Sequence, residues 1–260
     1  MRLMGVVNVT PDSFSDGGLY LDPDAAIAHG RRLADDGAEI LDVGGESTRP
    51  GAEPVAEAEE LARVVPVVAG LAGGGARISV DTSKAAVAAA ALEAGAEIVN
   101  DVTALRGDPE MAALCAERGA TVVLMHMAGN PRTMQLEPRY DDVVDEVGAF
   151  LAARLEAALA AGISEARVWV DPGIGFGKTA EHNFELLRRL GELRRLGRPI
   201  VVGTSRKSFI GAVDGSPPDE RLGGTIASSV LAAAAGAEIL RVHDVAEASQ
   251  ALAVARAVLG

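Results

Sequence analysis

The sequence predicts a (β/α)8 barrel, and two observations support that prediction. Short apolar runs alternate with longer amphipathic stretches from one end to the other, and the chain has 260 residues. Strands that alternate with helices pair in parallel through right-handed crossovers, and eight such units fill a barrel of about 250 residues. A doubly wound open sheet is the structural alternative, but open sheets of eight strands are less common. We expect one domain spanning residues 1–260.

The expected strands are the apolar runs, and polar residues follow where they end. They lie at residues 3–9, 39–44, 77–81, 97–100, 120–125, 167–171, 199–203 and 238–242. Glycines such as Gly37 and Gly95 are expected to end the intervening helices as left-handed C-caps. The last helix is expected at 244–259. Because the carboxyl ends of barrel strands gather on one rim, the polar residues there are the functional candidates.

Charge and composition exclude several classes of function. The formal net charge is −13, so no basic surface is expected for a nucleic acid backbone. The first residues lack the basic flank and cleavage site of a secretory signal, and no apolar stretch of about 18 residues follows, so we expect a cytoplasmic protein that does not enter a membrane. Cys115 falls in an expected helix between Met111 and Arg118 and should be a buried thiol.

Four polar residues at the expected rim form a candidate binding pocket. Asp81, Asn100 and Asp171 each end an apolar run, and the alternation of side chains along a strand lets them point toward the barrel axis. Each is also a suitable helix N-cap, but three such residues together with Lys207 favour a pocket. The set suits a flat heterocycle rich in N–H groups, because a ligand without those donors would leave buried acceptors unsatisfied.

An anion site is predicted at the last strand. Arg241 and His243 lie two residues apart, so both side chains face the same side of the strand. The loops after the seventh and eighth strands of a barrel commonly hold phosphate, and a buried arginine needs an anion or a carboxylate as its partner. A packed neutral histidine is the alternative for His243. His126 also lies on the rim, but no partner for it is evident.

Two loops and one motif complete the candidates. The loops that follow the first two strands are longer than usual, which makes them candidates for mobile lids. The glycine-rich stretch 173–178 resembles a phosphate-binding loop but lacks the P-loop spacing. Zinc motifs and a Gly-x-Ser-x-Gly elbow are missing from the sequence, so neither a dedicated zinc site nor a Ser-His-Asp hydrolase is expected. A Mg2+ ion between Asn8 and a substrate diphosphate is better supported.

Taken together, the motifs resemble the dihydropteroate synthase family over nearly the whole chain. They are GVVNVTPDSFSDGG (5–18), GESTRPG (45–51), VDT (80–82), ND (100–101), LMHM (124–127), DPGIGF (171–176), TSRKS (204–208) and RVHD (241–244). The first two strings are the most specific. The resemblance implies a barrel enzyme that condenses 6-hydroxymethyl-7,8-dihydropterin diphosphate with p-aminobenzoate, giving 7,8-dihydropteroate and pyrophosphate. It also implies a homodimer.

The resemblance further implies a role for individual residues. Those that hold the pterin ring would be Asp81, Asn100, Asp171 and Lys207. Those that receive the diphosphate, with Mg2+ bound to the first, would be Asn8, Arg241 and His243. Those that contribute to the p-aminobenzoate site would be Thr48, Phe176 and Ser208. Those that act in catalysis would be Asp16 and Arg49 from the long loops, together with Lys207, Arg241 and His243.

Three other classes of protein remain as alternatives. A methyltetrahydrofolate methyltransferase barrel needs no diphosphate site, so the arginine and histidine of the last strand argue against it. A non-catalytic pterin-binding paralogue should have lost the long loops or the anion-binding cations, and the sequence keeps both. A sugar-phosphate isomerase or aldolase would usually need a Glu or Lys base beside a phosphate loop. The rim carboxylates of this sequence instead follow the order of a pterin-binding enzyme.

Overall fold

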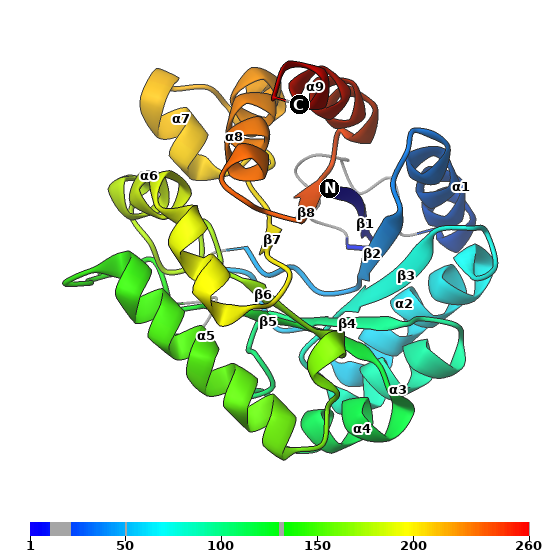
Figure 1. Ribbon diagram of the computed structural model, residues 1–260. Helices are drawn as coiled ribbons and strands as arrows, with labels where there is room; N and C mark the ends of the chain where they lie inside the picture. The colour runs from blue at the N-terminus through cyan, green and yellow to red at the C-terminus, as the bar shows by residue number, and fades with distance from the viewer. Residues whose placement is uncertain (11–21, 50, 130–132, 260) are drawn as a thin grey trace.

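The computed structural model describes residues 1–10, 22–49, 51–129 and 133–259. Eight parallel strands form one sheet in the order β6-β5-β4-β3-β2-β1-β8-β7, and helices surround them (Figure 1). An isolated parallel bridge between Val170 and Ile200 joins the two outer strands of that order, β6 and β7. The expected (β/α)8 barrel is therefore confirmed.

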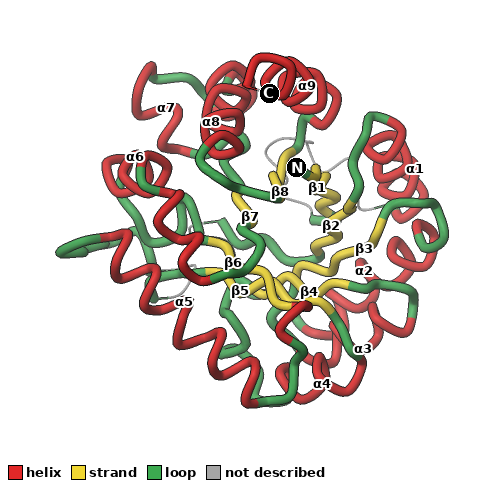
Figure 2. The backbone as a smooth tube through the Cα atoms, in the orientation of Figure 1, coloured by secondary structure: helices red, strands yellow, loops and turns green. Residues whose placement is uncertain are grey.

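The strands lie within two residues of their expected positions. They are β1 (Arg2–Asn8), β2 (Ile40–Gly44), β3 (Arg77–Asp81), β4 (Ile98–Asp101), β5 (Thr121–Met125), β6 (Val168–Asp171), β7 (Val201–Val202) and β8 (Ile239–Val242). The α-helices are α1 (Pro23–Asp35), α2 (Glu57–Leu71), α3 (Ala85–Glu93), α4 (Met111–Arg118), α5 (Val143–Ala160), α6 (Ala180–Arg188), α7 (Ser208–Asp214), α8 (Leu222–Ala234) and α9 (Val245–Leu259). Figure 2 shows these helices as an outer layer around the strands.

One connection differs from the expected single helix per unit. Between β7 and β8 the chain forms two α-helices, α7 and α8, so the described residues contain nine α-helices where eight helical segments were expected. Gly215, with φ of 77°, ends α7 in the left-handed conformation. Pro217 and Pro218 follow, and a proline has no N–H to donate to a helix, so the chain cannot continue α7 there. It turns through a short 3-10 segment, Pro218–Glu220, before α8 begins.

The barrel interior is filled by side chains. A buried cluster takes one side chain from each strand except β3: Met4, Ile40, Ile98, Val123, Trp169, Val201 and Ile239. A larger aliphatic cluster fills the space between the strands and the helices. Because the centre of the barrel is packed, a ligand has room only above it, at the rim where the carboxyl ends of the strands meet.

Several local expectations also hold. Gly37 and Gly95 follow α1 and α3 with φ of 109° and 115°, as a helix-ending glycine should. Cys115 is buried on α4, and burial raises the pKa of its thiol to about 12, so it remains protonated. No helix in the described part of the chain is long and apolar enough to cross a membrane.

Candidate active site

The acceptors predicted for the pocket gather on the rim. Asp81 and Asn100 lie side by side in the register between β3 and β4, and Asp171 ends β6. None of the three caps the helix that follows its strand. Those N-cap positions are taken by Lys84, Glu110 and Thr179. The helix-cap alternative is therefore wrong for all three residues, and their side chains are available to a ligand.

Arg241 is the centre of a buried polar network. Its Nε donates to Asp42 Oδ2 over 2.6 Å and its Nη2 to Asp81 Oδ2 over 2.9 Å. Asn100 Nδ2 donates to the same Asp42 oxygen over 3.0 Å. The carboxylate partner that a buried arginine requires is thus partly Asp42, a residue that the sequence analysis missed. A sign of it was present, because Asp42 is the one charged residue inside the apolar run of β2.

The network changes the acidity of its members. Burial raises the pKa of Asp81 to about 7, and the nearby Asp42 charge adds to the shift while Arg241 opposes it. Burial alone would lower the pKa of Arg241, but Asp42 and Asp81 keep it above its ordinary value. Arg241 therefore stays charged, and Asp81 is the member of the network that gains or loses a proton near neutral pH.

Asp171 and Lys207 are the other two residues predicted for the pocket. Asp171 Oδ1 accepts a hydrogen bond from the backbone N–H of Gly173 over 2.7 Å. Lys207 Nζ donates to the carbonyl oxygen of Ile174 and lies 4.5 Å from the ring centroid of Phe176. Burial lowers the pKa of Lys207 to about 8, and the Asp171 charge limits the fall. The amine can therefore act both as a donor and as a cation over an aromatic face.

His243 is neutral and oriented by a serine. Burial, followed by the charge of Arg241, holds its pKa well below the ordinary value. Ser205 Oγ lies 2.9 Å from Nδ1 of the ring and accepts from the backbone N–H of His243 over 3.2 Å. Arg206 joins the same two loops, since its Nε donates to Asp244 over 3.1 Å. The loops after β7 and β8 are thereby fixed to each other.

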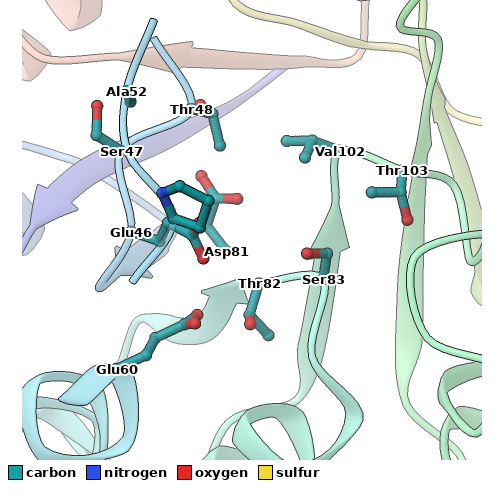
Figure 3. Close-up of a pocket in the computed structure, with 11 residues that line it drawn as sticks. Glu46, Ser47, Thr48, Ala52, Glu60, Asp81, Thr82, Ser83, Val102 and Thr103 are labelled. Carbon is teal, nitrogen blue, oxygen red and sulfur yellow. The ribbon is translucent and has the colours of Figure 1, made fainter. Parts of the chain in front are cut away.

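The loop after β2 borders a cavity of about 300 Å³ (Figure 3). Ser47 and Thr48 line it from the loop, and Asp81 and Thr103 line it from the ends of β3 and β4. Arg49 is half-buried in the same loop. This cavity brings Thr48, a predicted site residue, next to the predicted pterin pocket.

A partly buried ion cluster holds the base of that loop. Lys84 Nζ contacts one carboxylate oxygen of Glu46, in the loop, and one of Glu60, on α2. The other Glu46 oxygen accepts from the backbone N–H of Val55 over 3.4 Å. Glu60 is fully buried. None of these three residues was predicted from the sequence, and the available signal was Glu60, a charged residue at a buried position of the amphipathic helix α2.

The remaining predicted residues occupy different parts of the rim. Phe176 packs against a cluster that includes Met125 and Met127, while Ser208 is exposed at the start of α7. Asn8 ends β1 and is half-buried. Asp16 lies outside the described residues. The described part of the rim thus brings the pterin, anion and p-aminobenzoate candidates to one end of the barrel.

Known proteins are similar to this chain in sequence and in fold. A family described as pterin binding enzymes matches residues 4–243. The dihydropteroate synthase of Escherichia coli is 48% identical over 259 residues, which are 99% of this chain and 92% of that protein. The chain belongs to the dihydropteroate synthase family. It is a transferase that condenses a dihydropterin diphosphate with p-aminobenzoate and releases pyrophosphate.

Solved structures of dihydropteroate synthases superpose closely. The Xanthomonas albilineans dihydropteroate synthase with 4-aminobenzoic acid has a TM-score of 0.93 and 50% identity, over 100% of this chain and 93% of that one. The same bacterium's enzyme in complex with 7,8-dihydropteroate has a TM-score of 0.89 and 47% identity, over 100% and 94% of the two chains. The methyltransferase and sugar-phosphate alternatives are therefore set aside.

Proposed function

We propose that the rim binds its two substrates in adjacent places, with the diphosphate between them. The observation that carries the proposal is the network in which Arg241 joins Asp42 and Asp81 beside Asn100. In this network Arg241 is bonded to Asp81, one of the proposed pterin acceptors, and still has N–H donors for an anion. A single barrel domain would carry the whole activity.

The pterin ring would lie among Asp81, Asn100, Asp171 and Lys207. Carboxylate and amide oxygens of this set can accept from ring N–H and amino groups, and Lys207 can donate to a ring carbonyl or nitrogen. The donors of the ring favour ionised Asp81, so binding would release a proton at pH values below the pKa of about 7.

The diphosphate would be received by Arg241 and His243. A guanidinium carries five N–H donors, and Asp42 and Asp81 take two of them, so the others remain for phosphate oxygens. In the tautomer in which the Ser205 hydroxyl donates to Nδ1 of His243, the ring N–H is at Nε2 and would donate a hydrogen bond to a diphosphate oxygen. Placed donors of this kind are worth about 2–4 kcal/mol each in other enzymes.

Asn8 is the proposed protein ligand of Mg2+. Its amide oxygen is a hard donor of the type that Mg2+ prefers, and it lies at the rim at the end of β1. The described residues contain no group of three His, Cys, Asp or Glu side chains placed to hold a metal. These features fit an ion held mainly by the diphosphate, because Mg2+ commonly takes one or two protein ligands plus substrate oxygens. When bound, Mg2+ would neutralise charge on the diphosphate.

The p-aminobenzoate site would be formed by Thr48, Phe176 and Ser208. Phe176 offers an aromatic face next to Lys207, and Ser208 is exposed at the start of α7 beside it. Arg49, and Asp16 from the first loop, would approach the reacting groups from the long loops. These assignments follow the family motifs residue by residue.

The reaction is a displacement that needs no protein nucleophile. The arylamine nitrogen would attack the methylene carbon attached to the pterin, the bond from that carbon to the diphosphate oxygen would break ahead of attack, and pyrophosphate would leave. Arg241 and His243 would stabilise the charge that grows on the leaving group. A neutral arylamine is already nucleophilic, so its proton can pass to solvent or pyrophosphate without a strong general base.

Pyrophosphate release tests the proposal directly. The purified chain is given the dihydropterin diphosphate and Mg2+, with and without p-aminobenzoate, beside an Arg241→Ala variant. We expect release that depends on p-aminobenzoate and falls at least about a hundredfold in the variant. Release by the Arg241→Ala variant at the wild-type rate would contradict the role proposed for Arg241.

We also propose that the chain is a cytoplasmic homodimer. Leu231 on α8 and Val254 and Val258 on α9 are exposed large apolar side chains, and the two helices pack together. An apolar groove that includes Val230 and Leu252 runs between them. Light scattering with size-exclusion chromatography should give twice the chain mass of 26.6 kDa, and a Leu231→Asp variant should give the monomer mass.

A further inference from the structure

Lys178 is a buried lysine that none of the proposed roles uses. It follows the glycine-rich loop after β6, and only 3% of it is exposed. Its Nζ lies 2.9 Å from His126 Nδ1 and donates to the carbonyl oxygens of Gly173 and Phe176, each over 3.0 Å. All three partners are neutral groups. The amine should therefore hold the backbone of the glycine-rich loop in place, because the two carbonyls would lose their hydrogen-bond donor without it.

The glycine-rich loop has the opposite polarity to a phosphate-binding loop. In a phosphate loop the backbone N–H groups converge on an anion. Here two carbonyl oxygens converge on the chain's own amine. Gly173, Gly175 and Gly177 have φ of 67°, 82° and 63°, which turns the backbone so that this convergence is possible. The resemblance to a phosphate loop is therefore misleading at this position.

His126 completes the cluster and is held by aromatic rings. It is 6% exposed, and its ring centroid lies 4.9 Å from that of Phe150 in an edge-on arrangement. Burial, followed by the Lys178 charge, lowers the pKa of His126 to about 3, so the ring is neutral. A neutral imidazole nitrogen can accept from a charged amine or, as the other tautomer, donate to a neutral one. The cluster is thus satisfied in either protonation state of Lys178.

The loop that Lys178 gathers carries groups of the proposed site. Lys178 binds the backbone carbonyl of Phe176, and the ring of Phe176 lies against Lys207. Lys207 also donates to the carbonyl of Ile174, in the same loop. Two other carbonyls of the loop have their own donors, because Gln135 Nε2 donates to Gly175 and the Tyr140 hydroxyl to Gly177, over 2.7 Å each. Among these contacts, Lys178 is the one that joins two carbonyls of the loop, those of Gly173 and Phe176.

We propose that Lys178, held by His126, is a positioning residue that shapes the 173–178 loop and so sets the ring of Phe176 for p-aminobenzoate. The inference rests on the proposed function, which assigns Phe176 to that substrate. It predicts that loss of the amine affects the arylamine more than the pterin, because two of the four residues proposed for the pterin, Asp81 and Asn100, lie at the ends of β3 and β4.

The first test replaces Lys178 by methionine, which keeps the length of the side chain and removes its donors. The matched control is Val67→Ala, which makes a core cavity on α2 away from this loop. We expect the Lys178→Met variant to raise the KM for p-aminobenzoate about tenfold, while the Kd of the pterin diphosphate changes less than about threefold. Amide hydrogen exchange within 172–178 should accelerate in this variant and not in the control.

The second test compares two substitutions of His126. Asparagine keeps a polar atom near the position of Nδ1, whereas leucine keeps only bulk. We expect His126→Asn to retain most of the wild-type KM for p-aminobenzoate, and His126→Leu to approach the Lys178→Met value. Because only one of the three partners of Lys178 is changed, these variants also give an answer if Lys178→Met does not fold.

Two outcomes would overturn the inference. One is a KM for p-aminobenzoate in Lys178→Met that equals that of Val67→Ala, and the other is the same KM for both His126 variants. A Phe176→Ala variant separates this failure from failure of the proposed function. If Phe176→Ala leaves the KM unchanged, the assignment of Phe176 is wrong; if it raises the KM and Lys178→Met does not, only the positioning role is wrong.

Discussion

The loops after β2 and after β6 are each held by a lysine, but the partners differ in charge. Lys84 contacts the carboxylates of Glu46 and Glu60, whereas Lys178 contacts one imidazole and two carbonyls. Burial would lower the pKa of both amines. The two carboxylates reverse this for Lys84 and raise its pKa, while the pKa of Lys178 falls to about 7.

Because their partners differ, the loss of Lys84 and the loss of Lys178 should destabilise their loops for different reasons. Removing Lys84 leaves Glu60, which is fully buried, with its charge uncompensated. Removing Lys178 leaves only neutral acceptors unpaired, which costs less. The first loop therefore depends on charge balance, and the second depends on the presence of donors and on the protonation of its lysine.

The largest expected effect is on the Lys84 cluster. A Lys84→Met variant should lower the free energy of unfolding by about 2–3 kcal/mol, less than the cost of about 3–5 kcal/mol for breaking a fully buried pair, because the lysine is partly exposed. Adding Glu60→Gln should restore most of the loss, since no buried charge then remains. Chemical denaturation of both variants measures this. Equal stability of the single and double variants would show that charge balance does not hold this loop.

The next effect concerns pH and distinguishes the two lysines. The pKa of Lys178 is about 7 in the folded chain and ordinarily 10.5, so between those values the unfolded chain holds more protons and stability rises with pH. The free energy of unfolding of the wild type minus that of Lys178→Met should therefore increase by about 2 kcal/mol from pH 7 to pH 9. The corresponding difference for Lys84→Met should stay flat, because the raised pKa of Lys84 keeps it charged. A flat curve for Lys178 would contradict its lowered pKa.

The smallest effect extends the comparison to a buried carboxylate. Asp81 has a pKa raised to about 7, so the folded chain holds more protons between pH 3.8 and 7, and stability is lost as pH rises through that window. Asp81→Asn removes this loss and should raise the free energy of unfolding by about 1–2 kcal/mol at pH 8, with no gain below pH 4. Pyrophosphate release by the same variant should fall by about a hundredfold or more. A variant less stable than the wild type at pH 8 would show that the pair with Arg241 outweighs burial.

Residues at strand ends were predictable because their positions follow from local rules. Side chains alternate along a strand, and parallel register brings the ends of neighbouring strands together, so Asp81, Asn100 and Asp171 could be assigned to one rim. The loop residue His126 could not be assigned, because its partner lies 52 residues away. Asp42 was missed for the same reason, since it meets Arg241 across 199 residues.

The sequence by itself determined the barrel, the order of its strands and the residues that face its rim, because hydrophobic periodicity and motif order are properties of short stretches of chain. Only the tertiary structure decided which partner each polar side chain meets. It paired Arg241 with two carboxylates, gave Lys84 an ionic cluster and Lys178 a neutral one, and turned a glycine-rich motif away from phosphate binding. Burial and pairing are set by how distant segments close around the barrel, and they fix the charge state on which the chemistry depends.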